Sequence, residues 1–234
     1  MSRVVAVVQA RMGSARFPGK MLAQLGDQNL LSWVLERVCA AKKLDQTVLA
    51  TSTEKLDDQL AKIAESLDVG VVRGSEDDVL SRFVQAIEET SADLVVRVCA
   101  DNPFVAAEEI DRLVDAHISG GFDYSCNHQQ KLGNKYVDGV GAEIISADIL
   151  MQISSSTPKQ SHREHVTSFV WDNLSQFKVN ALVCPPNLAY PEIRMDIDTS
   201  QDLSRLDEFV KNFAITTKSS AVEIVNAYRQ FQNL

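Results

Sequence analysis

The chain has 234 residues and a formal net charge of −9, with 45% hydrophobic and 24% charged residues. This composition is typical of a globular protein, and we expect a single domain over residues 1–234. The acidic balance argues against nucleic acid and anionic membranes as partners, because both require a positive surface. No apolar stretch approaches the roughly 18 residues that cross a bilayer, so we predict no membrane-spanning segment.

The cysteines favour a reducing compartment. The chain has four, and no two of them have the CxxC spacing of a zinc knuckle or a thioredoxin-type motif. A short apolar run opens the chain, but Arg11 follows it and no small-residue cleavage site is evident. We therefore predict a cytoplasmic protein.

The first half of the chain alternates buried strands with amphipathic helices. Continuous apolar runs predict the strands, and apolar residues at helical spacing predict the helices. Ser75-Glu-Asp-Asp78 resembles a capping box that opens the third helix. This order predicts βαβ units, and hence an α/β fold with a mostly parallel central sheet and helices on both faces. The expected strands are Val4–Val8, Thr47–Thr51, Val69–Val72 and Leu94–Val98, and the expected helices are Leu30–Ala41, Asp57–Leu67, Val79–Glu89 and Ala107–Ile118.

The pattern changes after Gly120-Gly121. The stretch Asn127–Gly141 is polar and rich in Gly, Asn and Lys, and we expect an excursion at about 127–145 that serves as a lid or a dimer arm. Regular elements then resume. We predict strands at Ala142–Ile145, Phe177–Val183 and Ile193–Ile197, and helices at Arg163–Leu174, Leu203–Phe213 and Ala221–Phe231.

A cation-rich loop follows the first strand. In QARMGSARFPGKML, three cations, Arg11, Arg16 and Lys20, accompany Gly13 and Gly19. Ligands of open α/β sheets bind at the carboxyl ends of strands, and free backbone amides together with cations form a phosphate cradle. The loop matches neither the Walker pattern nor GxGxxG, because five residues separate its glycines and neither Ser nor Thr follows Lys20. The alternative is a solvated loop whose charges face water.

The same loop resembles the signature Arg-x-Gly-Ser-x-Arg-x-Pro-x-Lys of the sugar cytidylyltransferases. This family activates Kdo, sialic acid and related nonulosonic acids with CTP. Within it, the chain most resembles the branch of the spore coat polysaccharide biosynthesis protein F (SpsF). Further phrases of that branch follow in the same order along nearly the whole chain. They are RGSEDDVLSRF (Arg73–Phe83), ADLVVRV followed by AD and P (Ala92–Pro103), REHVT (Arg163–Thr167) and DIDT followed by DL (Asp196–Leu203).

The resemblance implies a Rossmann-like, GT-A-like nucleotidyltransferase fold and a homodimer. It also implies CTP and a small sugar as ligands, with Mg²⁺ as the cofactor. Arg11, Lys20 and Asp101 are the residues to which we assign catalysis. For Arg73, the alternative is a strand-end arginine paired with Glu76 or Asp77. The nucleotide-binding residues that the resemblance implies are Ala10, Arg11, Gly13, Ser14, Arg16, Lys20, Arg73 and Ser75.

Three aspartates near predicted strand ends are the candidate metal ligands. Asp101 follows Leu94–Val98, whereas Asp196 and Asp198 belong to the last predicted strand or follow it. Magnesium prefers oxygen ligands and uses one or two carboxylates together with substrate phosphates. The structural alternatives are that Asp101 shapes a turn and Asp198 caps a helix. The resemblance implies that Asp101 and Asp198 bind the metal, with Asp196 as a further ligand or as support for the ligands.

Four further residues are candidates for binding the sugar. Arg163 would clamp a carboxylate bidentately, and His165 lies close to it at a predicted helix start. Asp138 and Glu143 belong to the excursion and would meet sugar hydroxyls. The alternatives are a packed histidine and two surface carboxylates.

These residues predict nucleotide transfer. The anomeric hydroxyl of a sugar, expected to be an acidic nonulosonic-type sugar, attacks the α-phosphate of CTP and pyrophosphate leaves. The product would serve surface polysaccharide or glycoconjugate biosynthesis. Such chemistry needs alignment and charge neutralisation more than a protein nucleophile. Two alternatives stay open, a glycosyltransferase that consumes a nucleotide sugar and a nucleotide-binding partner without catalytic activity.

Overall fold

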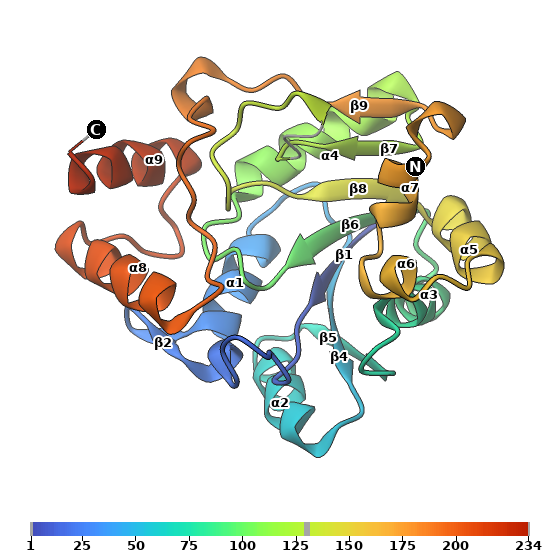
Figure 1. The fold of residues 1–234 in the computed structure, drawn as a ribbon, viewed down its shortest axis with the longest axis horizontal. Coiled ribbons are helices and arrows are strands. Elements are labelled where there is room, and N and C mark those ends of the chain that lie inside the picture. Colours follow the sequence, from blue (N-terminus) through green and yellow to red (C-terminus); the bar gives the residue numbers. More distant parts are fainter. Residues whose placement is uncertain (1, 129–131, 234) are drawn as a thin grey trace.

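The computed structural model describes residues 2–128 and 132–233. Within them, a seven-stranded sheet with the strand order β5-β4-β1-β6-β8-β7-β9 forms the centre of the molecule (Figure 1). A separate hairpin consists of β2 (Gln24–Leu25) and β3 (Gln28–Asn29). The strands of the large sheet are β1 (Val4–Gln9), β4 (Gln46–Ser52), β5 (Gly70–Gly74), β6 (Leu94–Cys99), β7 (Tyr124–Cys126), β8 (Glu143–Ser146) and β9 (Val179–Ala181).

The sheet is mostly parallel, which confirms the predicted fold class. β1 pairs in parallel with β4 and β6, and β4 pairs in parallel with β5. β8 runs antiparallel to both of its neighbours, β6 and β7, while β9 is parallel to β7. The central strands are continuous apolar runs because helices bury them on both sides.

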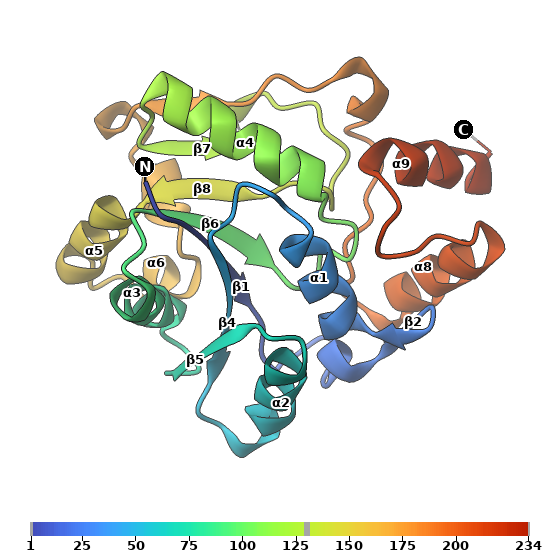
Figure 2. The same ribbon diagram turned by 180° about the vertical axis from the view of Figure 1, so that it is seen from behind.

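Helices cover both faces of the sheet. α1, α4, α8 and α9 contribute to a core with Ala6 and Val8, and Figure 2 shows α1 and α4 in front of the sheet. On the opposite face, seen in Figure 1, α3 and α5 pack with Val5 and Val7. This alternation follows from the two-residue period of a strand. The helices are α1 (Leu30–Cys39), α2 (Asp58–Ser66), α3 (Val79–Thr90), α4 (Ala107–Gly120), α5 (Ala147–Ser156), α6 (Gln160–Glu164), α7 (Ser168–Asp172), α8 (Ser200–Asn212) and α9 (Ala221–Phe231).

All strands and helices predicted for the first half of the chain are present, with ends shifted by at most two residues. The predicted capping box needs a correction. Asp78 is the N-cap of α3, where its carboxylate accepts a hydrogen bond from the backbone N–H of Ser81. The Ser75 hydroxyl instead accepts from the Asp78 N–H and shapes the loop before the helix.

Two predictions for the second half are wrong. The expected helix Arg163–Leu174 is two short helices, α6 and α7, interrupted where the β-branched pair Val166-Thr167 disfavours helix. The expected strand Ile193–Ile197 forms only an isolated bridge, Asp138 with Arg194. β7 and α5 were not predicted from the sequence. Residues 129–131 of the expected excursion lie outside the described residues, and its end forms β8.

The parallel pairing of β1 and β6 brings the first loop and Asp101 to one edge of the sheet. The segment before α8 reaches the same edge by a backbone hydrogen bond rather than by strand pairing, because the Ile197 N–H donates to the Asp101 carbonyl at 2.8 Å. Asp198 therefore lies close to Asp101 although 97 residues separate them in the chain. None of the described helices is long and apolar enough to span a membrane.

Candidate active site

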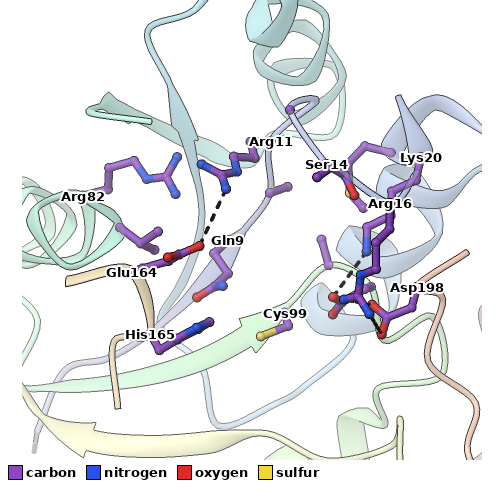
Figure 3. Close-up of a pocket in the computed structure, with 17 residues that line it drawn as sticks. Gln9, Arg11, Ser14, Arg16, Lys20, Arg82, Cys99, Glu164, His165 and Asp198 are labelled. Atoms are coloured by element: carbon purple, nitrogen blue, oxygen red, sulfur yellow. Dashed lines mark hydrogen bonds and ion pairs between the residues drawn. The ribbon is translucent and has the colours of Figure 1, made fainter. Parts of the chain in front are cut away.

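A cavity of about 320 Å³ opens at the carboxyl ends of β1 and β6 (Figure 3). The first loop, the start of α3, the segment after β6, the end of α6 and the residue before the cap of α8 all contribute to it. Nine of the predicted site residues lie around this one cavity. The predicted residues that line the cavity are Ala10, Arg11, Gly13, Ser14, Arg16, Lys20, Asp101, His165 and Asp198.

The first loop has a defined shape that depends on Asp57, a residue that the sequence analysis missed. The Asp57 carboxylate is buried and accepts hydrogen bonds from the Met12 N–H and from the hydroxyls of Thr51 and Ser52. Gly19 adopts a φ of 76°, which favours glycine, and its N–H donates to the Met12 carbonyl. The loop is thus anchored to the end of β4 before any ligand binds.

The three loop cations each face carboxylates across the cavity. Arg16 makes two hydrogen bonds of 2.8 Å to the Asp198 carboxylate. Lys20 is largely buried, and its ammonium donates to the Asp101 carboxylate at 3.3 Å and to the Ile197 carbonyl at 2.9 Å. Cations and a carboxylate therefore meet at one end of the cavity, where Figure 3 shows Arg16, Lys20 and Asp198 together.

Arg11 lies farther along the same cavity. Its guanidinium donates to the Glu76 carbonyl at 2.9 Å and approaches the carboxylates of Glu76, Asp77 and Glu164 at 3.8–3.9 Å. These contacts are longer than a direct charged hydrogen bond. The guanidinium is therefore only loosely held by protein carboxylates and is available to an anion.

Asp101 and Asp198 are the two candidate metal ligands that share the cavity. Their side chains are 35% and 25% exposed, so both are open to a ligand. The described residues contain no group of three or more His, Cys, Asp or Glu side chains arranged to hold a metal. Two carboxylates still suit Mg²⁺, which takes its remaining ligands from water and substrate phosphates. The site therefore fits a divalent ion that arrives with a nucleotide.

Asp196, the third candidate metal ligand, does not line the cavity. Its carboxylate pairs with Arg194 at 2.8 Å. Asp138 likewise lies outside and faces Arg194 at 3.5 Å, while burial and the Asp196 charge raise the pKa of its carboxyl group. These two acids belong to a neighbouring group of charges rather than to the space between Asp101 and Asp198.

Arg73 and Ser75 are also outside the cavity lining. The Arg73 guanidinium donates to the Ser52 and Glu54 carbonyls and pairs with Asp58 at 2.7 Å. The alternative of a paired strand-end arginine therefore describes this conformation, with Asp58 as the partner in place of Glu76 or Asp77.

Arg163 and His165, two candidate sugar-binding residues, differ in their surroundings. Arg163 donates to the carboxylate of Asp78, the N-cap residue of α3, at 2.6 Å and to the Ser154 carbonyl of α5 at 3.0 Å. Its guanidinium therefore links these two helices and does not line the cavity. Its neighbour His165 does line the cavity. Arg163 and His165 therefore have different surroundings, although only Glu164 separates them in the chain.

Glu143 is fully buried, which excludes the alternative of a surface carboxylate. It contacts Arg97, Tyr124 and Thr167 and does not line the cavity. Burial by itself raises the pKa of Glu143, but the Arg97 charge and these hydrogen bonds outweigh it and hold the pKa below its usual value. Arg97 also donates to the Gln9 side-chain oxygen at 3.0 Å, and Gln9 lines the cavity, so Gln9 links this network to the cavity.

Several lining residues were not singled out from the sequence. Gln9 belongs to the quoted signature, whereas Arg82 and Glu164 belong to the quoted phrases RGSEDDVLSRF and REHVT. Membership in those phrases was the available signal. Cys99 also lines the cavity, but burial raises the pKa of its thiol to about 12, so the thiol stays protonated and is no nucleophile.

A family model described as cytidylyltransferase matches residues 5–233. The chain belongs to the cytidylyltransferase family. It is therefore a nucleotidyltransferase, and the cavity at the carboxyl ends of β1 and β6 is the candidate active site of a cytidylyltransferase.

Individual relatives and a solved structure agree with this assignment. The spore coat polysaccharide biosynthesis protein SpsF of Bacillus subtilis is 33% identical over 230 residues, which cover 96% of this chain and 93% of SpsF. The 3-deoxy-manno-octulosonate cytidylyltransferase of Bdellovibrio bacteriovorus is 35% identical over 118 residues, covering 50% and 46% of the two chains. A cytidylyltransferase structure from Leptospira borgpetersenii superposes with a TM-score of 0.92 at 27% identity and covers 100% and 96%.

Proposed function

We propose that this cytidylyltransferase transfers CMP from CTP to the anomeric hydroxyl of a sugar and releases pyrophosphate. One observation carries the proposal. Asp101 and Asp198, from distant parts of the chain, share a cavity with Arg11, Arg16 and Lys20. A triphosphate and its divalent ion need both kinds of group in one place.

The loop cations perform charge neutralisation in this reaction. The sugar oxygen forms a bond to the α-phosphorus as the bond from that phosphorus to the β-phosphate oxygen breaks, and the hydroxyl proton passes to solvent. Lys20 and Arg16 exchange their carboxylate partners for phosphate oxygens and stabilise the charge on the departing pyrophosphate. Their present pairing with Asp101 and Asp198 keeps them oriented into the cavity before the nucleotide arrives.

Asp101 and Asp198 would hold the divalent ion, which we expect to be Mg²⁺. When bound, the ion supplies Lewis-acid polarisation of the phosphate and neutralises part of its charge. The carboxylates released by Lys20 and Arg16 become free for this role at the moment when the cations turn to the triphosphate.

The acceptor is proposed to be an acidic nonulosonic-type sugar used in surface polysaccharide or glycoconjugate synthesis. The similarity to SpsF and to a 3-deoxy-manno-octulosonate cytidylyltransferase supports this class. Within the cavity, the Gln9 amide and the His165 imidazole are polar groups suited to sugar oxygens. Arg97 has only donors, so the Gln9 oxygen faces Arg97 and the Gln9 NH₂ is left to serve a ligand.

The test measures pyrophosphate release with each of four nucleoside triphosphates, Mg²⁺ and a panel of acidic and neutral sugars. We expect release only with CTP and an acidic sugar, and no release after the metal is removed with a chelator. If pyrophosphate is released from CTP with neutral sugars and not with acidic ones, the proposal of an acidic acceptor is refuted. Transfer of sugar from a nucleotide sugar, without pyrophosphate, indicates a glycosyltransferase. Tight CTP binding without turnover on any sugar indicates a silent nucleotide-binding partner.

A further inference from the structure

Arg82 is a buried cation in the cavity wall, and two of its three guanidinium nitrogens donate no hydrogen bond to the described residues. It extends from α3, is only 2% exposed and lines the cavity beside Arg11 (Figure 3). Its Nε and Nη1 atoms have no hydrogen-bond partner among the described residues. Arg82 therefore differs from the loop cations, each of which has a carboxylate or carbonyl partner.

This arrangement is costly for the ligand-free protein. Removing a charged guanidinium from water without pairing it costs several kcal/mol in general. Burial accordingly lowers the pKa of Arg82, and the nearby charge of Arg11 lowers it further, while Asp57, Glu76 and Asp78 act in the opposite direction from a distance. The protein alone does not compensate the charge by hydrogen bonds to Nε and Nη1, so a compensating partner from outside the chain is expected.

The stem of Arg82 packs closely against the end of β5. Gly74, at the end of β5, lies so close that an added Cβ would meet the Arg82 Cγ at 3.0 Å. The side chain thus lies against β5, and its guanidinium is buried in the cavity wall. Long cationic side chains usually extend to water instead.

A second buried arginine of the same chain shows what a structural role looks like. Arg37 is 3% exposed, does not line this cavity, and donates to the carbonyls of Val105, Thr217 and Ser219 at 2.8–3.1 Å. Its guanidinium ties α1 to two loops. The Nε and Nη1 atoms of Arg82 donate no such bonds to the part of the chain that the structure describes, although Arg82 is buried to a similar degree.

We propose that Arg82 donates hydrogen bonds to oxygen acceptors of the bound nucleotide, at the end of the cavity opposite Lys20 and Asp198. This rests on the proposed function, since CTP is the ligand. Figure 3 shows Arg82, Arg11 and Glu164 at one end and Lys20, Arg16 and Asp198 at the other. The acceptors are either the carbonyl of the base or phosphate oxygens, which share the chemistry that a guanidinium recognises.

The test compares Arg82→Met and Arg82→Lys with the unmodified protein by calorimetric titration with CTP and by thermal unfolding without ligand. We expect both variants to lose about tenfold or more in CTP affinity, because charged hydrogen bonds are lost. We also expect the ligand-free Tm of Arg82→Met to stay the same or rise, since the variant removes an unpaired buried charge. A merely structural arginine would show a lower Tm instead.

Arg37→Met is the matched control. It should lower the ligand-free Tm, because it leaves several buried carbonyls unpaired, and should leave CTP affinity unchanged. Titration with CMP and with tripolyphosphate then distinguishes the two kinds of acceptor. Lower affinity of Arg82→Lys for CMP alone indicates the base, and lower affinity for tripolyphosphate indicates the phosphates.

The proposal is overturned if Arg82→Met and Arg82→Lys bind CTP as tightly as the unmodified protein. It is also overturned if Arg82→Met lowers the ligand-free Tm while Arg82→Lys retains full CTP affinity. Failure of the unmodified protein to bind CTP would instead contradict the proposed function, which the same titration measures separately.

Discussion

The ion pairs of the cavity border open space, whereas the ion pair inside the sheet is buried. In the cavity, Arg16 and Lys20 pair with Asp198 and Asp101, but every pair borders open space and can be exchanged. Between β6 and β8, Arg97 pairs with Glu143 where both side chains are at most 9% exposed. The two regions are neighbours, since Gln9 lines the cavity and also accepts a hydrogen bond from Arg97.

This difference in burial distinguishes charges that stabilise the fold from charges that are available to a ligand. Glu143 has partners on several sides, in Arg97, Tyr124 and Thr167, and this network joins β6, β7, β8 and the turn before α7. Each cavity cation has fewer partners than it has donors. Substitutions in the interior should therefore act mainly on stability, whereas substitutions in the cavity should act mainly on activity.

The largest expected effect is on stability, in Arg97→Met. Leaving Glu143 buried and unpaired should lower the free energy of unfolding by about 3–5 kcal/mol, measured by denaturant titration. The double variant Arg97→Met with Glu143→Leu should recover part of this loss, because the unpaired charge is gone. An Arg97→Met protein as stable as the unmodified one would remove the distinction between the two regions.

The next effect is on activity, in Lys20→Ala. We expect kcat/KM for pyrophosphate release to fall by about 10²–10³-fold, as for the loss of one preorganised donor at a developing charge. The circular dichroism spectrum should be unchanged, since the fold does not depend on the Lys20 ammonium. Lys43→Ala, which removes a surface pair with Asp115, is the matched control and should keep full activity. Unimpaired turnover in Lys20→Ala would contradict its role.

A smaller effect, again in the protein interior, is the dependence of stability on pH through His117. His117 is buried, with Nδ1 2.9 Å from the Ser125 hydroxyl, and burial lowers its pKa to about 4 from 6.5. Below its unfolded pKa, the unfolded chain binds more protons at His117 than the folded one, so stability should fall as pH drops from 6.5 toward 4. Activity at pH values above this window should be unaffected.

His117→Gln checks this by denaturant titration across that pH range. The variant keeps a hydrogen-bonding group beside Ser125 but cannot titrate, so its stability should depend less on pH. Burial raises the pKa values of Glu109 and Asp138, which act in the opposite direction, but both proteins share these groups. Identical pH slopes for the two proteins would show that His117 does not contribute.

The first half of the fold was predictable because its signals are local. Apolar runs and helical spacing placed β1, β4, β6 and their helices to within two residues. The prediction of the second half failed where tertiary contacts determine the backbone conformation. The segment Ile193–Ile197 has a strand-like pattern, but its backbone bonds to Asp138 and Asp101 instead of a neighbouring strand. Thr167 leaves the predicted helix at the turn where its hydroxyl reaches Glu143.

The site was predictable to the extent that its residues lie in one recognisable loop. The cations and the two aspartates of the cavity followed from the signature and from strand ends. Arg82 and Asp57 did not, because an arginine in a helical pattern and an aspartate after a strand are usually surface residues. Only their surroundings in the folded chain give them a role.

By itself, the sequence determined the parallel sheet, the cation-rich loop at its carboxyl edge and the family, since periodicity and a motif are properties of neighbouring residues. The tertiary structure alone decided which acids face the loop: Asp198 meets Arg16, whereas Asp196 turns to Arg194 and Glu143 lies inside the sheet. The physical reason is that the free energy of a charge depends on its burial and its partners, and the partners here come from segments far apart in the chain.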